Sequence, residues 1–464
     1  MSLSEPKKQP TQRELAFPEA DSGEARSAFT AGADGAEATH ACERLGSTDR
    51  LMEEVCEPGN LQRALEQVRR NHGAPGVDGM KVDHLPKYLE EHWDAIRTQL
   101  VGGVYKPQPV RRVEIPKPDG GVRKLGIPTV LDRLIQQAIL QVLQPRWDPT
   151  FSEHSYGFRP NRSAHQAVAR AQEYILDGYD YVVDIDLEKF FDRVNHDMLM
   201  GRVAKRVADK RLLRLLRAFL NAGVLENGLP KPTDEGTPQG GPLSPLLSNL
   251  VLDDLDRELE RRGHRFVRYA DDCNVYVRSE AAGHRVMTSL TRFITGKLKL
   301  RVNQDKSAVG RPWERKFLGF SFMNEATPRR TLAVKTLQRF KKRVRELTRR
   351  SGGFSLHHAV ATLSPYLKGW VEYFGFCETH WILKDLDGWI RRRLRNLAWK
   401  HWRSGPTRFR ALRRLGVSVR QAGGAAAGPS GLWRSSGLPA VQAALSVSFF
   451  AGLGLPSLAG SAAH

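Results

Sequence analysis

Two adjacent carboxylates interrupt an otherwise apolar stretch of this chain. The sequence RFVRYADDCNVYVRS, from Arg265 to Ser279, places Asp271 and Asp272 between two runs of apolar and aromatic residues. Two such runs separated by a short polar break predict a β-hairpin. Neighbouring like charges repel and lower stability unless something positive joins them. A polar turn is the simpler interpretation, because Asp favours turns. A divalent metal site is the alternative, and it requires a third carboxylate.

The segment YVVDIDLEKFFDRVNHD supplies that carboxylate. Asp184 and Asp186 stand two residues apart on a predicted strand, so they share one of its faces. A carboxylate on such an apolar strand is costly unless it is paired or binds metal. One of the two, together with Asp271 and Asp272, would hold two Mg²⁺ ions, which prefer oxygen ligands and borrow others from phosphates and water. The spacing alone does not choose between Asp184 and Asp186.

The charge of the chain is strongly positive and unevenly distributed. The 464 residues carry a net charge of +21, although residues 1–60 hold 12 acidic and only 6 basic residues. Arg329–Arg350 has ten Lys or Arg against one acid, and Lys384–Arg414 has eleven against two. Apolar residues interleave with these charges, as in helices with one basic face. The tracts predict salt-sensitive binding to a nucleic-acid backbone. A solvated basic surface is the alternative.

Cysteine spacing and hydropathy indicate which cellular compartment the protein is expected to occupy. Cys42, Cys56, Cys273 and Cys377 form no CxxC pair, so neither a zinc site nor a disulfide framework is expected. The N-terminus has no basic-then-apolar leader pattern. Residues 435–464 carry no Asp, Glu, Lys or Arg, but Pro, Gly and polar residues interrupt them, which disfavours a membrane span. We expect a cytoplasmic protein with no membrane partner.

Hydrophobic periodicity divides the chain into regions. Residues 1–58 are rich in Ala, Gly, Glu, Ser and Thr, show little periodicity and are predicted to be disordered. From there to residue 325 helical and strand patterns alternate, and PDGG between two strand patterns predicts a second hairpin. Beyond residue 331 only helical patterns occur until the Gly/Ala run QAGGAAAGPSG. The predicted fold class is α+β, followed by an all-helical basic region.

Further motifs surround the two carboxylate segments in a fixed order. They are IPKPDGGVRKLGIPTVLDRLIQQAI, SYGFRPNRSAHQAV, TPQGGPLSPLLSNL, LRVNQDKS and FLGF. With YADD and DLEKFFD, the set resembles the right-hand-like fingers and antiparallel palm sheet of a reverse transcriptase. GVDGM and SPYLKGWVEYFGF narrow the resemblance to group II intron-encoded reverse transcriptases, also called maturases. It implies fingers and palm in 59–325, a helical thumb or maturase domain in 326–418, and a short terminal module in 419–464.

The resemblance assigns roles at the metal site. In this family the first metal ligand stands six residues before the Asp of FFD, which is Asp186 here. Asp184 would then be a structural carboxylate paired to a base. Asp271 resembles the principal second ligand, and Asp272 lies beside the metals. Lys306, in NQDKS, resembles the lysine that protonates leaving pyrophosphate, and an unpaired surface lysine is the alternative.

Other residues resemble those that handle the incoming nucleotide. Phe191 resembles the aromatic that blocks a ribose 2′-OH and so selects deoxynucleotides, although core packing is the usual role of Phe. Gln239 and Gly240 resemble the loop against the nucleotide and template, where Gly permits close backbone approach. A Pro-Gly turn before a helix is the alternative. Lys117 and Arg123 straddle the PDGG turn and would grip a triphosphate, unless they are only solvated hairpin charges.

Basic residues are predicted to contact nucleic acid in two regions. Arg159 and Arg162, in GFRPNR, would touch template phosphates. The helical region would clamp primer–template and intron RNA through Lys341, Lys342, Arg343, Arg391, Arg392 and Arg393. Trp370 in that region is expected to be core. Residues 419–464 resemble the terminal module of the bacterial class C lineage, which lacks an endonuclease, and the preceding Gly/Ala-rich run reads as a degenerate linker.

The resemblance implies an RNA-directed DNA polymerase that uses two Mg²⁺ ions, with Mn²⁺ as a possible substitute. Its expected partners are deoxynucleoside triphosphates, an RNA template with a DNA primer, group II intron RNA and target DNA. Splicing assistance and retrohoming would follow. One alternative is a maturase that acts mainly by binding RNA. Another is a domesticated reverse transcriptase in phage defence or DNA repair. The sequence does not reveal the oligomeric state.

Overall fold

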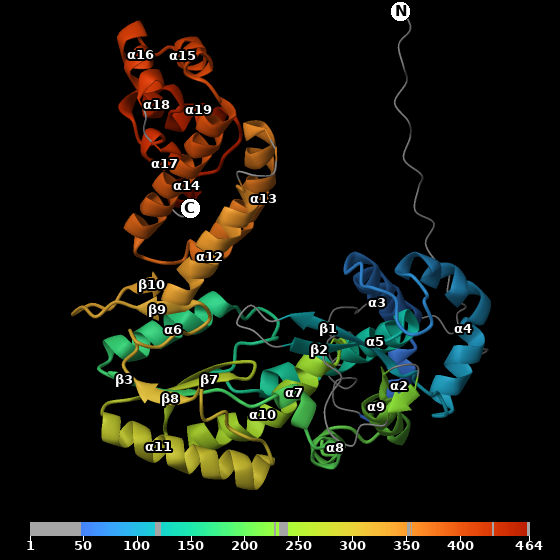
Figure 1. The fold of residues 1–464 in the computed structure, drawn as a ribbon. Helices are drawn as coiled ribbons and strands as arrows, with labels where there is room; N and C mark the ends of the chain where they lie inside the picture. Colours follow the sequence, from blue (N-terminus) through green and yellow to red (C-terminus); the bar gives the residue numbers. More distant parts are fainter. Residues whose placement is uncertain are drawn as a thin grey trace, which may run out of the picture. The chain divides into compact units, whose positions relative to one another are not determined.

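The computed structural model describes residues 48–116, 122–226, 229–231, 240–349, 353, 355–428 and 431–461 (Figure 1). Its helices are α2 (Leu51–Val55), α3 (Pro58–Arg70), η1 (Val82–His84), α4 (Leu85–Val101), α5 (Val130–Trp147), η2 (Asp148–Thr150), α6 (Ala164–Leu176), α7 (Phe190–Arg193), α8 (His196–Ala204), α9 (Lys210–Asn221), α10 (Ser244–Arg261), α11 (Glu280–Phe293), η3 (Ile294–Leu298), α12 (Val334–Leu347), α13 (Leu356–Phe374), α14 (His380–His401), α15 (Gly405–Arg414), α16 (Val419–Ala427), α17 (Leu432–Ser435), α18 (Pro439–Ala444), α19 (Val447–Gly452) and α20 (Leu458–Ser461).

Its strands are β1 (Val110–Pro116), β2 (Val122–Ile127), β3 (Tyr181–Ile185), β4 (Val224–Glu226), β5 (Leu229–Lys231), β6 (Arg265–Tyr269), β7 (Asp272–Val277), β8 (Ala308–Gly310), β9 (Phe320–Phe322) and β10 (Arg330–Leu332). They form sheets in the orders β2-β1-β4-β5, β10-β9 and β6-β7-β3-β8. Strands and helices alternate up to β10, and only helices follow within the described residues. This order confirms the predicted α+β class with a helical region after it.

The chain divides into two compact units. The first comprises the described parts of Met1–Ser163, Asp184–Val275 and His284–Ala308. The second comprises the described parts of Ala164–Val183, Tyr276–Gly283 and Val309–His464. The division therefore does not follow the predicted boundary after residue 325. Ala164–Val183 and Tyr276–Gly283 precede that boundary in the sequence but pack in the second unit. The order of motifs along the chain does not reveal this packing.

The sheet β6-β7-β3-β8 contains both carboxylate segments. Five of the six residues of β7 are buried, so side chains pack on both of its faces and the polar–apolar alternation of a half-exposed strand is absent. In β3, Val182, Val183 and Ile185 are buried while Asp184 is half-buried. The predicted strand and the predicted carboxylate hairpin are both confirmed.

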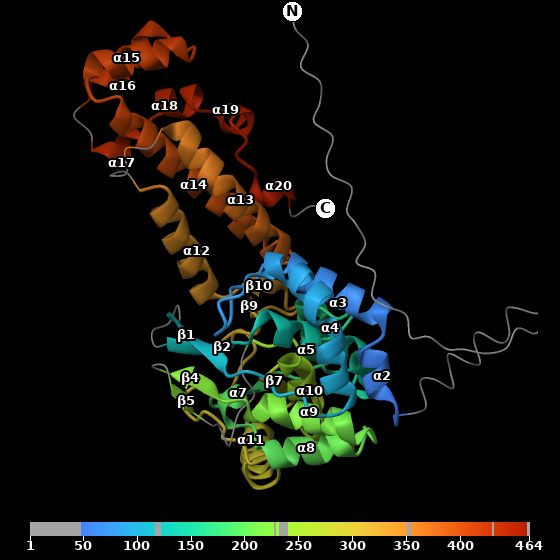
Figure 2. The same cartoon turned by 90° about the vertical axis from the view of Figure 1, so that its right-hand side faces the viewer.

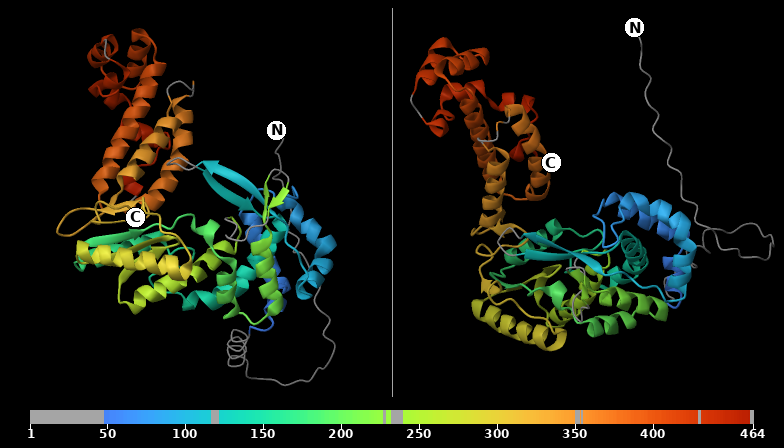
Figure 3. Two further views of the ribbon diagram at one scale, coloured as in Figure 1. Left: turned by 60° about the horizontal axis from the view of Figure 1, so that its bottom comes forward. Right: turned by 45° about the vertical axis from the view of Figure 1, so that its right-hand side comes forward.

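The second predicted hairpin is also confirmed. Strands β1 and β2 pair antiparallel from Arg111 with Ile127 to Pro116 with Val122 (Figure 3). The PDGG tip itself lies outside the described residues. The short strands β4 and β5 extend this sheet, and β4 runs parallel to β1. Neither was predicted, because three-residue strands carry too little periodicity to be recognised in a sequence.

The prediction that residues 1–58 are disordered is wrong for residues 48–58. Leu51 and Met52, in α2, are fully buried. The Asp209 carboxylate accepts a hydrogen bond from the backbone N of Met52 at 3.0 Å, and Arg211 pairs with Glu53 at 2.7 Å. These partners lie about 157 residues further along the chain, so the local sequence gives no sign of them. Residues 1–47 lie outside the described part of the chain.

The C-terminal region is helical, as predicted. Helices α13 and α14 run alongside one another, and α12 packs on α13 (Figure 2). Trp370 is buried and its ring centroid lies 4.3 Å from that of Phe340, which confirms it as core. The Gly/Ala run differs from its prediction as a linker. It forms most of α16, which Ser418 caps through the backbone N of Gln421 and which packs against α15.

Residues 431–461 pack onto α13 and α14. Asp387 of α14 accepts hydrogen bonds from Ser457 Oγ at 2.7 Å and the backbone N of Leu458 at 2.9 Å, which anchors α20. Arg395 donates to the carbonyl of Leu445 at 2.9 Å. The uncharged terminus therefore buries its apolar side chains in the helical unit. Within the described ranges, every helix is too short or too polar to cross a bilayer.

Candidate active site

The turn between β6 and β7 carries the adjacent carboxylates. Ala270 and Asp271 connect the two strands, and Asp272 begins β7. Ala270 has φ of +56°, in the left-handed region that non-glycine residues seldom occupy. Asp271 is half-buried and Asp272 is exposed. Their placement at the strand ends leaves both carboxylates outside the apolar interior of the sheet.

Asp186 follows β3 directly, and the NQDKS loop holds its backbone. The carbonyl of Asp186 accepts from the backbone N of Asn303 at 2.8 Å, and its N–H donates to Ser307 Oγ at 2.9 Å. Lys306 Nζ lies 3.7 Å from Asp186 Oδ1. The lysine predicted as a proton donor thus stands beside the predicted metal ligand. Because its side chain is 63% exposed, this ion pair adds little to stability.

The two carboxylate segments belong to neighbouring strands of one sheet. Strands β3 and β7 are adjacent in the sheet. Burial raises the pKa of the Cys273 thiol, and nearby carboxylates, including Asp184 and Asp272, raise it further. We call the end of β3 at Asp186, together with the β6–β7 turn at Asp271 and Asp272, the carboxylate edge.

The donor set suits a hard divalent cation. Asp186, with a side chain 29% exposed, and the exposed Asp272 offer carboxylate oxygens, which Mg²⁺ prefers. In the described residues, no group of three or more His, Cys, Asp or Glu side chains forms a ready-made metal site. A polymerase site does not require one, because Mg²⁺ takes one or two carboxylates and completes its octahedron with substrate phosphates and water.

Two predicted nucleotide contacts have informative surroundings. Phe190 is buried, whereas Phe191 is half-buried beside it, with ring centroids 5.2 Å apart. Phe191 is therefore not a fully buried core residue. Gly240 has φ of +132°, and a Cβ there would lie 2.7 Å from the carbonyl oxygen of Gly126 in β2. Only glycine fits both this backbone angle and this close approach.

Three predicted nucleotide contacts lie wholly or partly outside the described part of the chain. Lys117 and Gln239 lie outside the described residues. Arg123 belongs to β2, where its backbone pairs with Ile115, but its side chain lies outside the described atoms. These three roles remain predictions from the sequence.

The predicted template contact of Arg159 is wrong. Its side chain is only 5% exposed. All five of its N–H groups donate within the protein, to both carboxylate oxygens of Asp148 and to the carbonyls of Asp148, Ser152 and Ser155. No donor remains for a phosphate. Arg162 is more accessible: it donates to the carbonyl of Glu153 at 3.2 Å and lies over the Tyr156 ring.

The basic residues of the helical region differ in accessibility. In α12, Lys342 and Arg343 are exposed and Lys341 is half-buried. Arg391 in α14 is half-buried. Its neighbours Arg392 and Arg393 make contacts within the unit. Arg392 stacks on Trp433 at 4.5 Å, and Arg393 donates to Thr348 Oγ1 at 2.8 Å. They join α14 to α17 and to the end of α12, whereas Lys342 and Arg343 keep their side chains exposed on α12.

A buried network beneath the carboxylate turn was not predicted. Arg268 in β6 and Asp256 in α10 are both 0% exposed and form a bidentate pair at 2.6 and 2.7 Å. Burial would lower the pKa of Arg268, but the charge and hydrogen bonds of Asp256 outweigh it and leave the pKa raised. The Arg in the fourth position of RFVRY, directly after Phe and Val, was the available signal, since a buried charge requires a partner.

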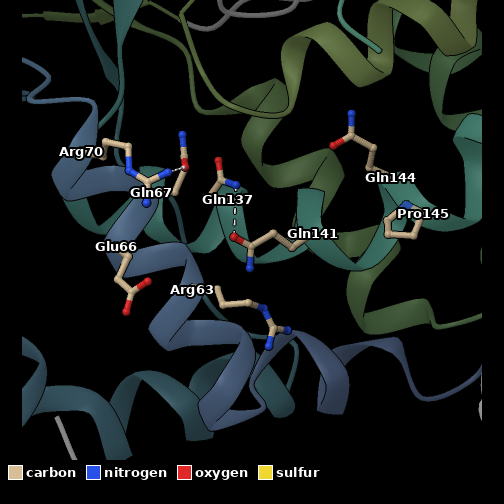
Figure 4. Close-up of a pocket in the computed structure, with 8 residues that line it drawn as sticks. All are labelled: Arg63, Glu66, Gln67, Arg70, Gln137, Gln141, Gln144 and Pro145. Carbon is tan, nitrogen blue, oxygen red and sulfur yellow. Dashed lines mark hydrogen bonds between the residues drawn. The ribbon is translucent and has the colours of Figure 1, made fainter. Parts of the chain in front are cut away.

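A separate pocket of about 450 Å³ lies between α3 and α5 (Figure 4). Its lining is rich in amides and arginines, and Gln137 donates to Gln141 one turn further along α5. The lining residues are Arg63, Glu66, Gln67, Arg70, Gln137, Gln141, Gln144 and Pro145. None of the predicted metal ligands belongs to it, so it is distinct from the carboxylate edge.

Comparison with known proteins agrees with this geometry. Residues 115–322 match the family model described as reverse transcriptase (RNA-dependent DNA polymerase), and residues 337–416 match the group II intron maturase-specific domain. The fold and these matches define a reverse transcriptase. Protein YkfC of Escherichia coli (strain K12) is 34% identical over 56% of this chain and 79% of its own length.

A second relative is an intron-encoded protein. Group II intron-encoded protein LtrA of Lactococcus lactis subsp. cremoris is 30% identical over 74% of this chain and 65% of LtrA. Among solved structures, a partial Cas6-RT-Cas1–Cas2 complex matches 54% of this chain and 43% of that chain, at 23% identity and a TM-score of 0.35. The chain belongs to the group II intron reverse transcriptase/maturase family.

Proposed function

We propose that this protein synthesises DNA on an RNA template by two-metal nucleotidyl transfer at the carboxylate edge. The proposal is carried by the sheet order, in which β3, followed by Asp186, is adjacent to β7, which begins at Asp272 directly after Asp271. Lys306 lies beside Asp186. The two carboxylate segments lie far apart in the sequence, and a polar hairpin turn alone would not require a further carboxylate after the neighbouring strand.

The residues of the chain have distinct roles in this proposal. Asp186, Asp271 and Asp272 would hold two Mg²⁺ ions, which activate the primer hydroxyl and stabilise leaving pyrophosphate. Lys306, whose Nζ lies 3.7 Å from Asp186 Oδ1, would give a proton to that pyrophosphate. Phe191 would exclude a ribose 2′-OH. The close contact between Gly240 and Gly126 would place the loop before α10 against the nucleotide-handling hairpin β1–β2.

Binding of intron RNA and assistance to splicing form the second part of the proposal. The observation in its favour is the exposed basic face of α12, with Lys342 and Arg343, inside the maturase-specific match. Such a face binds phosphates without reading bases. Retrohoming into target DNA would follow if both activities act on the same intron. A maturase that mainly binds RNA is the competing function.

Primer extension on an RNA template with Mg²⁺ tests the proposal. The Asp271→Asn variant should lose extension while retaining RNA binding, because its metal ligand is weakened and its basic surfaces are intact. Asp94→Asn is the matched control, since Asp94 is an exposed carboxylate on α4 away from this edge. Absence of extension by folded, RNA-binding wild-type protein would refute the polymerase, and the RNA-binding maturase would become the leading function.

A further inference from the structure

We propose that Arg268 is a positioning residue that holds the carboxylate turn in its working conformation. The inference rests on the proposed function, because it concerns the same metal site. All five N–H groups of its guanidinium have acceptors. Two bind the Asp256 carboxylate, and the others bind Ser155 Oγ at 2.7 Å, Asn249 Oδ1 at 3.1 Å and the carbonyl oxygen of Ala270 at 2.9 Å.

The last of these contacts reaches the turn itself. Ala270 directly precedes Asp271, and its left-handed backbone is strained for a residue other than glycine. Such a conformation persists only where the surroundings impose it. Arg268 fixes the Ala270 carbonyl from one side and links it to α10 through Asp256 and Asn249. The turn is thereby tied to a rigid 18-residue helix.

A second segment supports the same turn. The carbonyl of Gly157 accepts from Asn249 Nδ2 at 2.9 Å, and the backbone N of Tyr156 donates to the carbonyl of Arg268 at 2.9 Å. A Cβ at Gly157 would overlap the backbone N of Ala270 and lie 2.9 Å from the carbonyl carbon of Tyr269. Glycine at 157 therefore allows backbone-to-backbone contact beneath the turn.

The network does not neutralise the metal ligands. The charge of Arg268 is matched by Asp256, so it leaves no net positive charge for Asp271 and Asp272. Stability alone does not account for it either, because a buried ion pair is often no more stabilising than apolar residues of similar volume. The geometry points to orientation of the turn. While Asp256 balances its charge, the Arg268 guanidinium also donates hydrogen bonds to Ala270, Asn249 and Ser155.

Two variants separate orientation from stability. Arg268→Met/Asp256→Leu removes both buried charges together, so the fold is expected to survive. Gly157→Ala leaves the ion pair intact and displaces the turn directly. Gly201→Ala in α8 is the control, because a Cβ there meets nothing within 4 Å. Each protein is assayed for thermal unfolding, primer–template binding, extension across a Mg²⁺ titration, and hydrogen exchange of the turn amides.

Both variants should bind primer–template like wild type and extend it more slowly, by roughly 10–100-fold, with a higher Mg²⁺ requirement. Amides at 269–273 should exchange faster, whereas those of α5 should not. The exchange readout needs no activity, so it decides this inference even if wild-type protein does not extend primers, which would refute the proposed function separately. Should the double variant not fold, Gly157→Ala decides alone. Extension and exchange like those of Gly201→Ala would overturn the inference.

Discussion

Removing only one partner of the buried pair gives a prediction whose size follows from the structure. In Arg268→Met, the Asp256 carboxylate remains in a site that is 0% exposed and loses both of its hydrogen bonds from the guanidinium. An uncompensated buried charge costs about 3–5 kcal/mol. A folded domain is stable by only about 5–15 kcal/mol. The substitution should therefore remove a large part of the stability of the first unit.

The matched control uses the same substitution at an exposed ion pair. Arg343 lies 3.1 Å from Glu346 in α12, with side chains 54% and 43% exposed. Solvent screens such a pair, so Arg343→Met should cost about 0–1 kcal/mol. The pH dependence should also differ. Burial without Arg268 raises the pKa of Asp256 in the folded variant above its unfolded value, so the penalty exists at neutral pH and shrinks as the pH falls through that raised pKa.

Hydrogen exchange of the slowest amides in α10, measured at neutral and acidic pH, reports the free energy of unfolding of the first unit without requiring the whole chain to unfold in one step. Arg268→Met/Asp256→Leu should recover most of the loss, since no unpaired charge remains. A loss below about 1 kcal/mol in Arg268→Met, or a double variant no better than the single one, would refute the reasoning about the buried charge.

Three further predictions concern individual side chains. Phe191→Ala should raise the incorporation of ribonucleotides relative to deoxynucleotides in primer extension, and unchanged sugar selectivity would show that Phe191 does not exclude the 2′-OH. Phe190→Ala, at the buried neighbour, should instead lower the free energy of unfolding by about 3–5 kcal/mol in denaturant titration. Arg162→Met should weaken RNA binding and reduce its salt dependence by about one phosphate contact, while Arg159→Met should lower the melting temperature without changing that dependence; a filter-binding salt titration compares them. Cys273 should resist iodoacetamide in mildly alkaline buffer until the protein is denatured, because burial raises its pKa and little thiolate forms; mass-spectrometric labelling of native protein at this residue would contradict its burial.

The exceptions to sequence-based prediction share one cause. Arg159 stands in a basic motif, yet its five donors are used by a chain segment that folds around it. Leu51 and Met52 stand in a stretch of low periodicity, yet they are buried in a helix that is held by Asp209 at the backbone N of Met52 and by Arg211 at the side chain of Glu53. The type of a side chain determines which groups it can bind. Whether its donors and acceptors are already paired inside the protein depends on residues that are distant in the sequence.

The sequence by itself determined the elements and the chemistry. Runs of alternating or continuous apolar residues predicted the strands around Asp186 and Asp271, because burial of apolar side chains sets strand and helix periods locally. The ordered motifs identified the family by their resemblance to its own, which is independent of those periods. Tertiary structure alone decided that Arg268 and Gly157 meet beneath Ala270. That contact joins three chain segments, and no local pattern encodes the packing that brings them together.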